Sequence, residues 1–329
     1  MTPRAVGTAA IGIAITLLIA SCTTEQQSTP QPTLTSTTST TTTSTTSTTT
    51  TSTTTTTAPP QTTSTTAPSG PADALVPLLV GGANDGGWLF LGAWQQDRWQ
   101  ESTDPSGNPI RPGIEAGTSF VVSNLSGETP ARLGENTEAC FDGQVSPEID
   151  VEVAPPEPPG FGYNAVAVLQ KPWPLKPRPV AVASTAPDAY QTLGEAAFAD
   201  EPVDATKGAI EQLVIADLDG DGDGEALASF EFVQPSAGPG APGDLAALLV
   251  IDTTTRTAET VLLSAVDEDL DAELFPIIER YRVLDIADLN GDGRMEVLVH
   301  AWYYEGASVV VYTYDGSGLT QVLAAGCGA

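Results

Sequence analysis

Near its C-terminus the chain reads Ile286-Ala287-Asp288-Leu289-Asn290-Gly291-Asp292-Gly293-Arg294-Met295-Glu296, and an earlier stretch reads Ile215-Ala216-Asp217-Leu218-Asp219-Gly220-Asp221-Gly222-Asp223-Gly224-Glu225. Counted from Asp217 and Asp288, side-chain oxygens fall at positions one, three, five and nine, and glycine falls at position six. Glycine permits the tight turn that folds these oxygens around one cation. Calcium binds six to eight oxygens. Both stretches therefore predict calcium loops.

All the expected site residues of the two loops except Arg294, at position seven, offer side-chain oxygens, and a backbone carbonyl and water complete each set. The expected site residues are Asp217, Asp219, Asp221, Asp223 and Glu225 in the first loop, and Asp288, Asn290, Asp292, Arg294 and Glu296 in the second. The first loop carries more carboxylates, so we expect it to bind Ca²⁺ more tightly, with both loops in the range of roughly 0.1 to 1 mM. Two acidic, glycine-rich turns without metal are the alternative.

The residues that follow each loop distinguish it from an EF-hand loop. An EF-hand loop ends with a carboxylate at position twelve and continues into a helix. Here position twelve is Ala228 or Val299, and residues 226–233 and 297–304 are β-branched and aromatic runs that predict strands. A strand that runs into D-x-[D/N]-G-D-G-x-x-E and out into another strand resembles the FG-GAP/VCBS repeat, the calcium-loop blade unit of integrin-α-type β-propellers.

This resemblance implies an all-β fold with a propeller-like arrangement of four-stranded blades. Each loop-bearing unit, at about residues 211–264 and 282–324, has sequence for four strands. Whether the blades close into a ring, and how many there are, stays open. Short apolar or alternating runs predict further strands, and proline-dense segments predict loops or edge strands. The expected strands are 74–80, 88–94, 118–125, 165–170 and 179–183, and the proline-dense segments are 154–162 and 171–179.

The N-terminal residues predict export. Arg4 precedes an apolar run, residues 5–20, that is too short for a membrane-spanning helix and leads into Ile19-Ala20-Ser21-Cys22. This ending resembles a bacterial lipoprotein signal. The resemblance implies a signal peptide at residues 1–21, a lipid on Cys22, and an extracytoplasmic protein anchored to the bacterial cell membrane or cell surface. An ordinary cleaved secretory signal is the alternative.

Composition divides the rest of the chain. Residues 22–70 are expected to be a disordered linker, because they are rich in Thr and Ser and offer almost no apolar surface to bury. Residues 71–329 then form the β domain. If Cys22 carries lipid, Cys140 and Cys327 are the two cysteines left, and they are expected to form a disulfide in an oxidising compartment.

The net charge and the lack of catalytic motifs in the sequence argue against some classes of function. The chain has 42 acidic and 12 basic residues, a net charge of −30, which argues against nucleic acid as a partner. Its one histidine, His300, lies on an expected strand, without a G-x-S-x-G motif elsewhere, and is expected to pack near Trp302 or Tyr304. Alternation along the strand at 88–94 is expected to place Trp88 and Trp94 on one side.

We therefore expect a non-catalytic cell-surface protein that binds a protein or glycan or acts in adhesion, as the resemblance implies. A secreted, glycan-directed hydrolase that uses carboxylates on a propeller face is one alternative. A solute-binding lipoprotein is another, although the sequence lacks the alternating strand and helix patterns of a two-lobed α/β binding protein.

Overall fold

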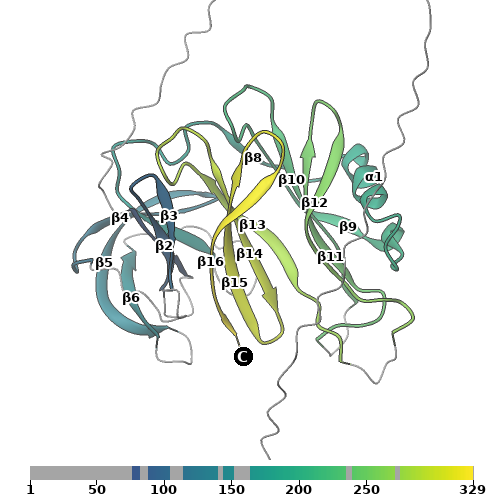
Figure 1. The fold of residues 1–329 in the computed structure, drawn as a ribbon, viewed down its shortest axis with the longest axis horizontal. Helices are drawn as coiled ribbons and strands as arrows, with labels where there is room; N and C mark the ends of the chain where they lie inside the picture. Colours follow the sequence, from purple (N-terminus) through teal and green to yellow (C-terminus); the bar gives the residue numbers. More distant parts are fainter. Residues whose placement is uncertain are drawn as a thin grey trace, which may run out of the picture. The chain divides into compact units, whose positions relative to one another are not determined.

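The computed structural model describes residues 76–81, 88–103, 114–139, 144–151, 164–234, 239–270 and 275–328, without the side chains of 76–77, 135–139, 144–151 and 327–328. All of these residues belong to one unit, Thr63–Ala329. They form three antiparallel sheets, none of which closes into a barrel within the described part of the chain (Figure 1). The expectation of an all-β fold is confirmed.

Sheet 1 has seven strands in the order β3-β2-β1-β7-β4-β5-β6, so that chain neighbours are not always sheet neighbours. Strand β7 lies between β1 and β4 and pairs antiparallel with both. The strands are β1 (Val76–Gly81), β2 (Trp88–Gln95), β3 (Arg98–Glu101), β4 (Ser119–Asn124), β5 (Gly127–Ala139), β6 (Gln144–Val151) and β7 (Ala165–Leu169).

Sheets 2 and 3 each contain a four-stranded meander. Sheet 2 has the order β12-β11-β10-β9-β8, in which β8 adds a fifth strand, and sheet 3 has the order β13-β14-β15-β16. The elements of sheet 2 and its outer face are β8 (Val180–Val182), α1 (Asp188–Ala197), the 3-10 helix η1 (Ala205–Lys207), β9 (Ala209–Ala216), β10 (Glu225–Phe232), β11 (Leu245–Asp252) and β12 (Thr257–Ala265). Those of sheet 3 are β13 (Arg280–Ala287), β14 (Glu296–Tyr303), β15 (Gly306–Tyr314) and β16 (Leu319–Gly328).

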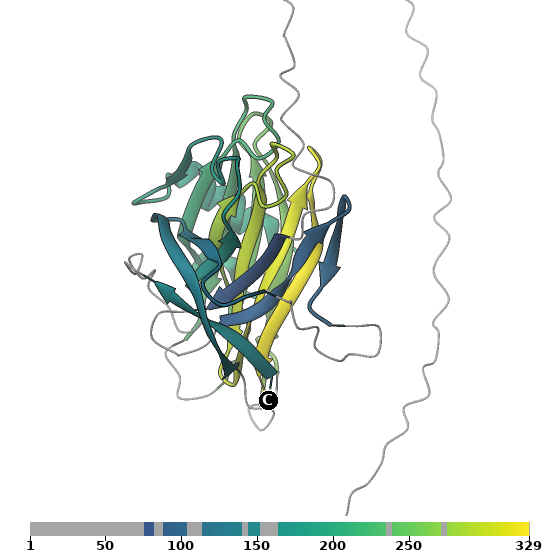
Figure 2. The ribbon, with the colours of Figure 1, turned by 90° about the vertical axis from the view of Figure 1, so that its left-hand side faces the viewer.

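Sheet 3 is buried on both faces, between sheets 1 and 2 (Figures 1 and 2). Successive side chains of a strand point to opposite faces. On β14, Val297 and Val299 accordingly join the core shared with sheet 2, while Leu298 joins the core shared with sheet 1. The near-continuous apolar run of β14 is therefore that of a strand covered on both sides.

The outer face of sheet 2 is covered by α1 and the residues after it. Phe198, which follows the helix, packs against Phe230 of β10 with ring centroids 5.5 Å apart. The layers therefore run from α1 through sheet 2 and sheet 3 to sheet 1 (Figure 1). Each of sheets 2 and 3 carries one of the acidic loops, at the turn between the first two strands of its meander.

The expectation that Trp88 and Trp94 share one side of β2 is wrong. The pairing of β2 with β1 shifts register, since Leu79 pairs with Phe90 whereas Leu78 pairs with Gly92. The extra residue reverses the alternation, as a bulge does. Trp88 therefore lies in the core on the far face of sheet 1, while Trp94 lies on the face toward sheet 3, where it contacts the Trp99 ring at 4.9 Å.

Candidate metal loops and the segment that joins them

The two acidic loops occupy the same corner of their respective sheets. The first joins β9 to β10 and the second joins β13 to β14, the first and second strands of each meander. The pairs that close the loops are equivalent, Ala216 with Glu225 and Ala287 with Glu296. Strands lie on both sides of each loop, as the sequence predicts, and no EF-hand helix follows either one.

A buried leucine fixes each loop to the core. Leu218 and Leu289, at position two, are both 0% exposed. Leu218 lies in the core between sheets 2 and 3, and Leu289 lies in the core between sheets 3 and 1. Gly222 and Gly293, at position six, have φ values of +98° and +89°, a left-handed conformation that glycine adopts without strain.

The first loop gathers three carboxylates. One oxygen from each of Asp217, Asp219 and Asp221 lies within 4.8 Å of the other two. The backbone orients these side chains, since the N–H of Gly220 donates to Asp217 (2.7 Å) and that of Asp223 donates to Asp221 (2.8 Å). All the groups are hard oxygens, the donor type that calcium prefers.

Glu225 closes the first loop from the next strand. Its Oε2 accepts a hydrogen bond from the N–H of Leu218 at 2.9 Å. Burial raises the pKa of Glu225, and the nearby charges of Asp219 and Asp221 raise it further. The arrangement therefore places negative groups close enough to oppose one another's ionisation, an effect that a bound cation would reverse.

The second loop repeats these bonds in a more buried setting. The N–H of Gly291 donates to Asp288 (2.7 Å), that of Arg294 donates to Asp292 (2.8 Å), and that of Leu289 donates to Glu296 (2.8 Å). Asn290 replaces the acid at position three, and its amide nitrogen donates to Glu296 Oε1 at 3.1 Å. Among the described residues, a group of three carboxylates as close as that of the first loop does not occur here.

Burial has its largest effect on the acids of the second loop. Asp288 is 3% exposed and Glu296 is 1% exposed. Burial raises the pKa of Asp288 to about 6 and raises that of Glu296 well above its ordinary value, with the Asp292 charge adding to both effects. Oxygen ligands held in a buried, mutually repelling set fit a divalent cation, which would favour their charged forms.

Residues 173–178, which we call the strap, run across both loops. The Trp173 indole N–H donates to the carbonyl of Asp288 at 3.1 Å, and the carbonyl of Leu175 accepts from the N–H of Asp288 at 2.6 Å. Lys176 forms an ion pair of 2.9 Å with Asp285, which is fully buried. The strap is irregular in structure, as the sequence predicts for residues 171–179.

Arg178, the last residue of the strap, contacts both loops. Its Nε donates to the carbonyl of Asp217 (2.6 Å) and its Nη2 to that of Leu218 (2.9 Å), both in the first loop. Its Nη1 donates to the carbonyl of Gly293 in the second loop at 2.6 Å. Trp173 and Arg178 are not predicted as site residues from the sequence. Their only signal is an aromatic and a basic residue within a proline-rich segment of an acidic chain.

The structure does not describe the side chains of the other predicted site residues, the three cysteines. Cys22 and Cys140 lie outside the described residues, and Cys327 lies on β16 without a described side chain. No helix within the described part of the chain is long and apolar enough to cross a bilayer.

His300 is 5% exposed and stacks on Trp302 with ring centroids 4.9 Å apart, so its predicted packing is confirmed. Burial and the Arg282 charge lower the pKa of His300 to about 4.

Comparison with protein-family models, with curated proteins and with solved structures finds no match. The resemblance to FG-GAP/VCBS repeats therefore rests on the sequence of the two loops and of the strands around them.

Proposed function

We propose that this chain is a non-catalytic binding protein of the bacterial cell surface whose β domain is stabilised by two calcium ions, one in each loop. The observation that carries this proposal is the recurrence of one loop at one corner of two neighbouring sheets. Asp217, Asp219 and Asp221 converge there within 4.8 Å, and Asp288 and Glu296 form the buried counterpart. The FG-GAP/VCBS resemblance gives the loops a structural rather than a catalytic role.

The meanders β9–β12 and β13–β16 support a propeller-like arrangement in this proposal. Each has four antiparallel strands, the number in a propeller blade. They share a core, as adjacent blades do. Sheet 1, with seven strands, departs from the blade pattern, so we propose two regular blades and a larger third layer.

The cell-surface part of the proposal rests on the N-terminal sequence. The run that ends at Cys22 supports a lipid anchor, and the Thr/Ser-rich residues 22–70 would hold the domain away from the membrane. The proposed partner is a protein or a glycan. A groove of about 460 Å³, lined in part by the strap, is a candidate position for such a partner. The groove is lined by Leu125, Ser126, Gly127, Lys176, Pro177, Arg178, Pro179 and Val180.

Calorimetric titration with calcium tests the two sites. We expect two bound ions per wild-type chain, with dissociation constants of roughly 0.1 to 1 mM. Asp217→Ala and Asp288→Ala should each abolish one of them, because each removes the position-one oxygen of its loop. Glu128→Ala, an exposed acid of sheet 1, is the matched control and should leave both sites intact. Unchanged calcium binding in both loop variants would refute the assignment.

A further inference from the structure

The strap makes equivalent contacts with the two loops, although the residues that make them differ. In the first loop, Arg178 Nε donates to the carbonyl at position one, that of Asp217. In the second loop, the Trp173 indole donates to the carbonyl at position one, that of Asp288. The strap therefore donates a hydrogen bond to the equivalent peptide carbonyl in both loops.

That peptide group also holds the last acid of each loop. The peptide after Asp217 presents its N–H, on Leu218, to Glu225 at 2.9 Å. The peptide after Asp288 presents its N–H, on Leu289, to Glu296 at 2.8 Å. Because the carbonyl and the N–H of one peptide lie in one rigid plane, a donor from the strap fixes the direction in which the N–H meets the carboxylate.

Arg178 also reaches the other side of the second loop. Its Nη1 binds the carbonyl of Gly293 at 2.6 Å, and the N–H of the same peptide, on Arg294, donates to Asp292 at 2.8 Å. One guanidinium therefore orients a peptide that holds Glu225 and a peptide that holds Asp292. The planar fork of arginine allows these bonds at the same time.

A direct bond completes the connection between the loops. The N–H of Met295, next to Glu296, donates to the carbonyl of Leu218 at 2.8 Å, and Arg178 Nη2 donates to the same carbonyl at 2.9 Å. Arg178 is only 20% exposed, and it also lies 3.7 Å from the Asp217 carboxylate. A shift of either loop must therefore disturb the bonds by which Arg178 holds the other.

We propose that Arg178 is a positioning residue that couples the two loops, so that ordering of one loop, including ordering by a bound cation, favours the ordered form of the other. The cation part of this inference rests on the proposed function. Two sites that bias one shared element have linked affinities, and the linkage acts equally in both directions. Arg178 is that shared element here.

A calcium titration of paired variants tests the coupling. Asp292→Ala disables the second loop, and Asp219→Ala disables the first, without removing an oxygen that Arg178 contacts. With Arg178 present, each variant should weaken calcium binding at the remaining loop by at least about fivefold, the low end of ordinary coupling. In an Arg178→Met background, the Met295–Leu218 bond still joins the loops, so the same variants should change the remaining affinity by a clearly smaller factor than they do with Arg178 present.

Arg132→Met, at an exposed arginine of β5, is the matched control and should leave the coupling intact. A loss of affinity at the remaining loop that is the same with and without Arg178 would overturn the proposal.

Hydrogen exchange in the presence of a chelator tests the same coupling without a cation. Arg178→Met should speed exchange several-fold at the amides of Leu218 and Arg294, one from each loop, whereas Arg132→Met should change neither. Faster exchange in one loop only would overturn the coupling. A wild-type chain that binds no calcium would refute the proposed function, while the exchange result would still decide whether Arg178 joins the loops.

Discussion

Removal of calcium is expected to lower the melting temperature of the protein by about 10 °C. At a free calcium concentration about tenfold to a hundredfold above the dissociation constant, each site stabilises the folded state by roughly 1.4 to 2.7 kcal/mol. Two sites give roughly 3 to 5 kcal/mol, and a domain of this size loses about 2 to 4 °C for each kcal/mol. The repulsion among the buried acids of the second loop is included in this figure, because it lowers the stability of the calcium-free chain to which the bound form is compared.

The measurement is thermal unfolding followed by circular dichroism, in calcium and in excess chelator. A variant that carries both Asp219→Ala and Asp292→Ala is the control, since its melting temperature should not respond to calcium. A wild-type melting temperature that is equal in calcium and chelator would contradict the stabilising role of the loops.

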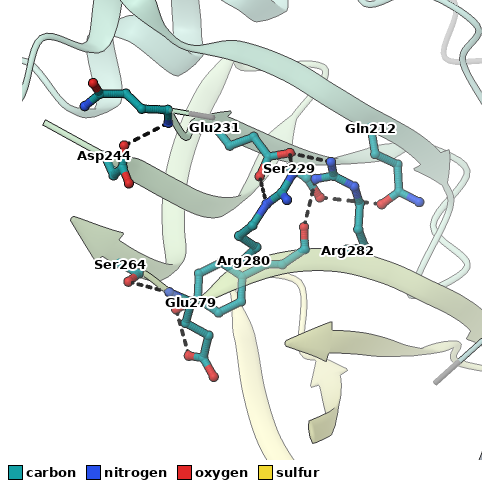
Figure 3. Close-up of polar contacts among 10 residues, drawn as sticks. Gln212, Ser229, Glu231, Asp244, Ser264, Glu279, Arg280 and Arg282 are labelled. Carbon is teal, nitrogen blue, oxygen red and sulfur yellow. Dashed lines mark hydrogen bonds and ion pairs between the residues drawn. The ribbon is translucent and has the colours of Figure 1, made fainter. Parts of the chain in front are cut away.

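Glu231→Ala is expected to destabilise the protein by about 2 to 3 kcal/mol. Glu231 lies on β10 and is 7% exposed, and Arg280 of β13 binds it through Nε (2.7 Å) and Nη2 (2.8 Å). Arg282 donates to the same carboxylate (Figure 3). Removal of one partner from a buried pair leaves an uncompensated charge, which costs about 3 to 5 kcal/mol when burial is complete. The partial exposure of Arg280, 37%, reduces this figure.

Urea unfolding measures the effect of Glu231→Ala, with the exposed Glu128→Ala as a control that should change stability by less than about 0.5 kcal/mol. The contacts of Glu231 with Arg280 and Arg282 join sheet 2 to sheet 3, so their loss should lower the stability of the whole β domain. Equal stability of Glu231→Ala and the wild type would show that the contact between these sheets does not depend on this network.

The contribution of Glu231 should also depend on pH. Burial acts to raise the pKa of Glu231, but the hydrogen bonds from Arg280 and the charge of Arg282 outweigh it, and the pKa is lowered. A carboxyl group with a lowered pKa stabilises the folded state above its unfolded pKa, about 4.3, and loses this contribution as the pH falls through the folded value. The stability difference between wild type and Glu231→Ala should therefore narrow below about pH 4. A constant difference from pH 7 to pH 2 would contradict this.

The strands around the loops could be predicted because local sequence determines them. The run after each glutamate, such as residues 297–304, is β-branched and aromatic, and it forms β14. The earlier strands β1, β2, β4, β7 and β8 also lie where short apolar runs predict them. The sequence pattern does not predict β3, β5, β6 or α1. Pro130 and Gly134 interrupt the pattern of β5, and α1 begins directly after Pro187 within a loop-like stretch.

The arrangement of sheet 1 depends on contacts that no local pattern contains. The placement of β7 between β1 and β4 joins residues far apart in the chain, and the bulge in β2 depends on its pairing with β1. The two loops were predictable as acidic turns with fixed spacing. The contact of Trp173 with Asp288 was not, because it spans 115 residues and depends on how the strap crosses the packed sheets.

Diffraction from crystals grown in calcium would locate the bound ions themselves, through their anomalous scattering. We expect two peaks, one among the oxygens of Asp217, Asp219, Asp221 and Glu225 and one among those of Asp288, Asn290, Asp292 and Glu296. Crystals in saturating calcium that show no peak in either loop would contradict the proposed calcium sites.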